Sequence, residues 1–140
     1  MADASPYVLE DQIGFKLRLA NQRHLELFNA ALPDLTPTQF STLFKLSEQG
    51  PLSQNYLGRL VAMDAATTKG VVDRLRRRGL VASVPSATDR RRLDLSLTAA
   101  GQALIAAALV RAAQISADTT RMLSPQDRGQ LLALLDKIRG

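Results

Sequence analysis

Residues 64–98 combine a basic helix with a basic hairpin, and this stretch constrains the fold more than any other part of the chain. Asp64 is suited to cap the start of a helix, and Gly79 follows three consecutive arginines as a helix C-cap. Two short strands are predicted after it, over residues 80–84 and 93–97. In the second strand the apolar side chains at 93, 95 and 97 are expected to share the buried face.

The positive charge of the chain is concentrated in the same stretch. Residues 69–92 include eight basic and two acidic side chains, which give this segment a net charge of +6. The whole chain carries +5, so the residues outside this segment sum to −1. Such localised charge is the footprint expected of a protein that binds a polyanion. A solvated charged face is the ordinary alternative, but two separate basic clusters around one hairpin argue against it.

The preceding residues predict two further short helices. Thr36 can cap a helix in which Pro37 takes the first position and Gln39 completes a capping box, with Phe40, Leu43 and Phe44 on its buried face. Ser53 caps a second helix, and Asp64 caps the basic one. Two short helices joined by a tight turn form a helix-turn-helix. With the hairpin, they predict a mainly α fold with a small β-hairpin wing, a winged helix-turn-helix.

In the basic helix, Val71, Val72 and Leu75 are predicted to face the core and to leave the polar side chains outward. Small and hydroxyl-bearing residues in its first turns would approach base edges in the major groove, and the arginines near its end would contact phosphates. The candidate DNA-binding residues of this helix are Ala65, Ala66, Thr67, Thr68, Lys69, Arg74, Arg76 and Arg77.

The hairpin loop supplies a second set of candidates. Arginine side chains suit the minor groove, where the potential is most negative over narrow A·T tracts. An aspartate among them is better explained as a residue that orients Arg90 or Arg91 by a charge-assisted hydrogen bond. The candidate DNA-binding residues of the wing are Asp89, Arg90, Arg91 and Arg92.

Apolar stripes also occur outside the predicted helix-turn-helix and wing. Residues 9–32 predict one long helix that Pro33 ends, and Thr98 and Ser124 begin two more helices with apolar seams. Because these stripes lie outside the helix-turn-helix and the wing, we expect them to be buried in a dimer interface. The expected organisation is an N-terminal dimerisation helix at 1–34, a reading lobe at 35–98 and C-terminal dimerisation helices at 99–140, within one compact domain.

Composition argues against several functions. The chain has no cysteine and one histidine, and it has no phosphate loop or clustered carboxylates, so we expect no catalytic residue, metal site or cofactor. The N-terminus does not read as a signal peptide. Residues 103–117 are interrupted by Arg111 and Gln114 and are expected to be too short and too polar to span a bilayer. We therefore expect a cytoplasmic protein without membrane contact.

The sequence contains LTPTQF at 35–40, DRL at 73–75, RGLV at 78–81, DRR at 89–91 and LTAAG at 97–101. These motifs resemble those of the MarR family of bacterial transcription regulators, and the resemblance covers nearly the whole chain. The resemblance implies a homodimer of winged helix-turn-helix subunits on a palindromic operator in double-stranded DNA, with Arg91 in the minor groove and Asp89 orienting it. Lys69 and Gly70 stand where many members have Thr-Arg, which leaves the base contacts open.

The resemblance also implies a ligand-responsive repressor. In the family a small, usually anionic and often aromatic effector binds between the reading lobe and the dimer helices, and DQIGF at 11–15 with QR at 22–23 is similar to members that regulate catabolism of aromatic acids or their CoA thioesters. The candidate pocket residues are Arg18, Gln22, His24, Phe40 and Phe44. His24 can equally be a core or interface histidine, and Arg18 a solvated helix residue. The alternative function is a non-specific architectural DNA-binding protein that responds to no ligand.

Overall fold

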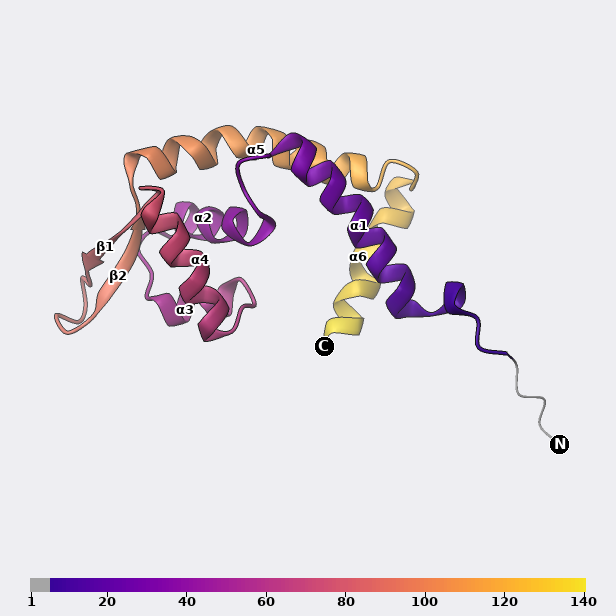
Figure 1. Cartoon of the computed structure of the whole chain (residues 1–140), viewed down its shortest axis with the longest axis horizontal. Helices are drawn as coiled ribbons and strands as arrows, with labels where there is room; N and C mark the ends of the chain where they lie inside the picture. Colours follow the sequence, from indigo (N-terminus) through magenta and orange to yellow (C-terminus); the bar gives the residue numbers. More distant parts are fainter. Residues whose placement is uncertain (1–5) are drawn as a thin grey trace.

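The computed structural model describes residues 6–140 and shows an elongated molecule in which one long helix joins two ends (Figure 1). The elements in chain order are η1 (Leu9–Asp11), α1 (Ile13–Ala31), α2 (Pro37–Gln49), α3 (Gln54–Leu60), α4 (Ala65–Arg77), β1 (Val81–Pro85), β2 (Leu93–Leu97), α5 (Ala99–Thr119) and α6 (Pro125–Arg139). The hairpin and α2 to α4 form one end, and α1 and α6 form the other (Figure 1). This confirms the predicted winged helix-turn-helix with flanking helices.

Residues 1–5 lie outside the described residues. They include most of the N-terminal stretch that was inspected for a signal peptide, and they begin the predicted segment 1–34.

Side-chain caps begin each of the five helices for which the sequence predicted one. Thr36 and Gln39 form a reciprocal capping box, with both hydrogen bonds at 3.2 Å. The side chains of Ser53, Asp64, Thr98 and Ser124 each accept a hydrogen bond from the backbone N–H three residues later. These bonds satisfy backbone donors that the first turn of a helix leaves without partners.

The first helix begins later than the sequence predicted. Residues Leu9–Asp11 form a single 3₁₀ turn, and Gln12 is extended, so the α-helix begins at Ile13 and not at Leu9. The Gln12 side chain donates to the carbonyl of Val8 at 2.9 Å, which holds this break in place. Of all the residues in α1, Phe28 is the one that is buried, and the apolar side chains of its first turns remain exposed.

The core lies where α2, α3, α4, the hairpin and α5 meet. Leu43, Leu57, Val72 and Leu75 are fully buried there, and Ile105 joins them from α5. Each such side chain stabilises the fold by about 1.5–3 kcal/mol relative to an exposed one. On α2 Leu43 is fully buried as predicted, and Phe40 and Phe44 are partly buried and pack against the core. The helix also buries Thr42 and Leu46, which were not predicted.

The two strands pair in antiparallel register, from Val81 opposite Leu97 to Pro85 opposite Leu93. β1 lies one residue later than predicted. The predicted alternation in β2 is wrong at its start, because Leu93 is 64% exposed and Asp94 is 7% exposed. Asp94 is turned inward to pair with Arg92, whose Nε donates to its carboxylate at 3.0 Å.

Within residues 6–140, the 21-residue helix α5 has the length and composition of a membrane span, with a mean hydropathy of 1.2 in its most apolar window. The predicted stretch, residues 103–117, is shorter than this helix, and a single helix of this kind is weak evidence for a membrane span. Its apolar residues have another explanation, because Ile105, Ala108 and Ile115 are buried in the core of the chain. In α6 no residue is buried, and Leu132, Leu134 and Ile138 are each more than half exposed.

Candidate nucleic-acid interface

Helix α4 exposes a face of small and polar side chains at its N-terminal end. Ala65, Ala66, Thr67 and Lys69 are exposed, whereas the predicted inward residues Val71, Val72 and Leu75 are buried. Small side chains let a helix approach base edges closely in the major groove. The geometry of this face therefore suits the reading role that the sequence predicted for it.

Thr68 is the exception, and its predicted outward position is wrong. It is 2% exposed, and its hydroxyl donates to the Asp64 carbonyl one turn earlier at 2.7 Å. A Cβ at Gly58 would stand 2.6 Å from this hydroxyl, so α3 and α4 pack closely at this point. Thr68 was identifiable from the sequence, because extending the buried stripe of α4 back by one turn from Val72 reaches it. Its role is to pack the two helices.

An acidic residue organises the cations of α4. Asp73 accepts from Lys69 Nζ at 2.8 Å and from Arg76 Nη1 at 3.2 Å. The hydrogen bond from Lys69 is the main reason that the pKa of Asp73 lies below its usual range. Arg76 also donates to the Ser83 hydroxyl on β1 at 3.0 Å. This bond links the predicted reading helix directly to the wing.

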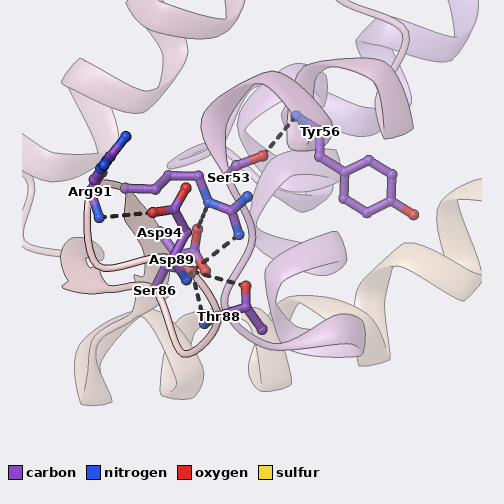
Figure 2. A network of polar contacts seen from close by, with 8 residues as sticks. Ser53, Tyr56, Ser86, Thr88, Asp89, Arg91 and Asp94 are labelled. Atoms are coloured by element: carbon purple, nitrogen blue, oxygen red, sulfur yellow. Dashed lines mark hydrogen bonds and ion pairs between the residues drawn. The ribbon is translucent and has the colours of Figure 1, made fainter.

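The wing loop exposes Arg90 and Arg91, while Asp89 holds its backbone (Figure 2). The Asp89 carboxylate accepts from the backbone N–H of Arg91 at 2.9 Å, and its carbonyl accepts from the backbone N–H of Arg92 at 3.1 Å. These bonds form a tight turn of the kind that aspartate favours. The sequence predicted a bond from Asp89 to an arginine side chain, and the structure corrects the partner to the backbone of Arg91.

Arg92 differs from its two neighbours, because its guanidinium is bonded within the hairpin. It donates to Asp94 and, through Nη2, to the Ser86 hydroxyl at 3.1 Å. The four wing residues predicted as one set therefore divide into two exposed arginines, one turn-forming aspartate and one internally bonded arginine.

Sequence reasoning missed a role for Arg78 beyond its charge. Its guanidinium donates to the Asp34 carbonyl at 2.7 Å, and Gln39 accepts from it at 3.4 Å. Arg78 therefore ties the end of α4 to the connection between α1 and α2. A partner 44 residues away leaves no local pattern in the sequence.

A cavity of about 200 Å³ lies between α1, α2 and α5. Its lining residues are His24, Phe28, Pro37, Phe40, Ser41, Ala112, Ile115 and Ser116. Of the five predicted pocket residues, the structure brings His24 and Phe40 together here. Phe44 lines a neighbouring cavity that also includes Phe40, whereas Arg18 and Gln22 lie on exposed turns of α1.

Comparison with known proteins identifies the family. The model of the MarR family matches residues 35–93. The HTH-type transcriptional repressor NicR of Pseudomonas putida is 41% identical over 138 residues, which cover 97% of this chain and 87% of NicR. The chain belongs to the MarR family.

Solved structures agree with this assignment. A probable transcriptional regulator from Pseudomonas aeruginosa is 48% identical, with a TM-score of 0.89 over 94% of this chain and 99% of that one. BpsR of Bordetella bronchiseptica, whose DNA binding is regulated by 6-hydroxynicotinic acid, is 36% identical, with a TM-score of 0.90 over 96% and 98% of the two chains. The MarR-family chain described here is therefore similar to these proteins over almost its whole length.

Proposed function

We propose that this MarR-family regulator is a sequence-specific DNA-binding repressor that acts as a homodimer on a palindromic operator. The observation that carries the proposal is the direct contact between two basic elements: Arg76 of α4 bonds to Ser83 of β1, and the loop of that hairpin exposes Arg90 and Arg91. In this arrangement α4 would occupy the major groove while the wing reaches the adjacent minor groove. The repressor name of NicR and the DNA binding of BpsR support the proposal.

Residues 1–34 and 99–140 would hold two reading lobes at 35–98 in register. One lobe recognises only a half-site, so specificity requires a second copy about one DNA turn away. The exposed apolar side chains of α6, including Leu132 and Ile138, support a dimerising role for the C-terminal segment, because a monomer would leave them in water.

The effector would be a single-ring aromatic acid bound in the cavity that includes His24 and Phe40. A volume of about 200 Å³ is below the roughly 300–1,000 Å³ typical of sites for drug-sized ligands, so it favours one ring over a complete CoA thioester. The aromatic side chains of Phe28 and Phe40, whose ring centroids are 6.2 Å apart, supply apolar walls. The regulation of BpsR by 6-hydroxynicotinic acid supports this ligand class.

The hydrogen bonds of His24 indicate which polar groups such a ligand would carry. Thr119 donates its hydroxyl proton to the Ile115 carbonyl, so it accepts from His24 Nδ1, 2.8 Å away. This leaves Nε2 of a neutral ring as a hydrogen-bond acceptor. Nε2 would accept from a hydroxyl group on the ring of the ligand.

DNA binding is tested by fluorescence anisotropy with fragments from upstream of the protein's own gene and with random duplexes. The proposal predicts a preferred fragment, and a Thr67→Ala/Lys69→Ala variant that loses the preference while retaining residual binding to all duplexes. A non-specific architectural protein would bind upstream and random DNA alike, and this variant would weaken both equally. Salt dependence is steep in either case and does not separate the two functions.

Ligand response is tested on the preferred fragment with benzoate, hydroxybenzoates, 6-hydroxynicotinic acid and benzoyl-CoA as competitors. We expect a hydroxylated ring acid to release the DNA, and His24→Ala to require more of it without losing operator binding. Thr119→Val is the matched variant, because it removes the partner of Nδ1 but leaves the His24 ring in the cavity. If no ring acid releases specifically bound DNA, the ligand half of the proposal is wrong and the DNA half stands.

The same proposal places the protein in the cytoplasm as a regulator without enzymatic activity. Its support is membership in a family of DNA-binding regulators.

A further inference from the structure

Three side chains at the base of the wing form a closed polar cluster, which we call the wing clasp: Ser86, Arg92 and Asp94. Arg92 donates through Nε to the Asp94 carboxylate at 3.0 Å and through Nη2 to the Ser86 hydroxyl at 3.1 Å. The backbone N–H of Ser86 donates in turn to the Arg92 carbonyl at 3.0 Å. Ser86 and Arg92 are therefore bonded to each other through both backbone and side chain.

Ser86 extends the clasp into the loop. Its hydroxyl also accepts from the backbone N–H groups of Thr88 at 3.3 Å and Asp89 at 3.2 Å. Asp89 then fixes the backbone of Arg91. A continuous set of hydrogen bonds thus runs from the base of the hairpin to the residue at its exposed end.

The clasp is protected from water on its acidic side. The Asp94 side chain is 10% exposed and that of Arg92 is 47% exposed. A carboxylate in such a position needs a partner, because burying an unpaired charge is costly. The fork of the guanidinium meets two acceptors at once, and the single ammonium of a lysine cannot reproduce that geometry.

We propose that the wing clasp is a positioning device that sets the path of the wing loop and so places Arg91 for the minor groove, with Arg92 bound to the hairpin and not to DNA. The proposal rests on the proposed DNA-binding function. In this proposal Arg91 contacts DNA, whereas Ser86 and Asp94 affect DNA binding only by positioning Arg91.

The first test compares Arg92→Lys with wild type on the preferred operator. Lysine keeps the charge, so a phosphate contact by residue 92 would survive the change. The clasp predicts instead a loss of affinity of about three- to tenfold, the scale of one ordinary hydrogen bond lost. It also predicts faster hydrogen exchange at the amides of Thr88 and Asp89 in the free protein, a readout that a DNA contact would not change.

The second test is Asp94→Asn, for which the wing clasp and a purely electrostatic effect predict changes in DNA affinity of opposite sign. Removing a negative charge close to DNA strengthens binding if electrostatics alone decides. The clasp predicts weaker binding by a few-fold, and no further loss when Asp94→Asn is added to Arg92→Lys. Asp34→Asn, an exposed carboxylate outside α4 and the wing, is the matched control and should leave affinity unchanged.

The result that overturns the clasp is specific operator binding by wild type together with unchanged or tighter binding by both Arg92→Lys and Asp94→Asn. Failure of wild type to prefer any operator would instead overturn the proposed function. The exchange measurement on the free protein still tests the clasp in that case, because unchanged protection at Thr88 and Asp89 in Arg92→Lys contradicts it.

Discussion

At the scale of single residues, Thr98 and Gly101 join the reading lobe to the long helix. The Thr98 hydroxyl donates to the Gly79 carbonyl at 2.6 Å and accepts from the Gly101 backbone N–H at 3.1 Å. A Cβ at Gly101 would stand 2.1 Å from the Leu80 carbonyl oxygen, which is backbone and cannot move aside cheaply. The glycine is therefore required by the close approach of α5 to the start of the wing.

Gly101→Ala is expected to destabilise the fold by about 1–3 kcal/mol or more, the usual cost of overpacking a close contact. Urea unfolding followed by circular dichroism measures this free energy. Gly70→Ala is the matched control, because an added Cβ there meets only ordinary contacts with the Arg74 guanidinium. A helix-interior alanine at position 70 should be neutral or stabilising by roughly 0.5–1 kcal/mol. Equal stability of Gly101→Ala and wild type would contradict the close contact.

Local patterns predicted residue roles well where the decisive partner is near in sequence. The five N-caps were predictable, because each cap bonds a backbone N–H three residues away. Leu93 was predicted to be buried and Asp94 to face outward, and the structure shows the reverse, because Asp94 is buried by its pairing with Arg92 at the end of a short hairpin. Period-two alternation carries no information about such a pair, and its loss at a strand end is apparent only in three dimensions.

At the scale of elements, α4 depends on an ionised carboxylate at its first turn. The pKa of Asp64 lies below its ordinary value of 3.8, mainly because its carboxylate accepts the backbone N–H of Thr67 at 2.7 Å. A carboxyl group whose pKa is lowered by folding stabilises the folded state above the unfolded pKa. That stabilisation is lost as the pH falls through the unfolded and then the folded value.

Asp64→Asn should therefore be less stable than wild type near pH 6, and the difference should shrink as the pH falls below the ordinary pKa of 3.8 towards the lower pKa of the folded state. Urea unfolding at pH 6 and pH 3 measures it. Ser53→Ala is the control, since it removes the cap of α3 without a titrating group and should cost about 1 kcal/mol at both pH values. A pH-independent difference between Asp64→Asn and wild type would contradict the role of the charge.

The residues that line the cavity could be predicted only in part from the sequence. His24 and Phe40 meet at the cavity because α1 and α2 both pack on α5, and this crossing depends on contacts such as the hydrogen bond between His24 and Thr119, 95 residues apart. Arg18 is two turns earlier on α1, where its guanidinium lies 5.3 Å from the Phe15 ring centroid. Helical periodicity grouped the residues of α1 by face but could not show how far along the helix the cavity extends.

At the scale of the whole molecule, most of the exposed large apolar side chains belong to α1, α5, α6 and the segments next to them. Of these helices, α1 and α6 lie at the end away from the reading lobe (Figure 1). In a homodimer, these surfaces would bring two reading lobes to a fixed separation. Stable protein interfaces bury roughly 1,200–2,000 Å² in total, which an elongated chain with long terminal helices can supply.

Leu132→Asp/Ile138→Asp is expected to convert the dimer into a monomer, because two charges would replace side chains that are 55% and 61% exposed in the single chain. Sedimentation velocity measures the change, and operator affinity should fall by at least an order of magnitude as half of the contacts are lost. Leu93→Ser is the control, since that leucine is equally exposed but lies on the wing. A variant that remains dimeric would show that α6 is not the interface.

Hydroxyl-radical footprinting on the preferred operator shows whether two copies of the chain bind DNA symmetrically. We predict protection that is symmetric about a dyad, with half-sites about one helical turn apart. The outer minor-groove protections should disappear in Arg91→Ala, while the inner pattern persists at higher protein concentration. Protection without two-fold symmetry, or outer protections that Arg91→Ala leaves unchanged, would contradict the account.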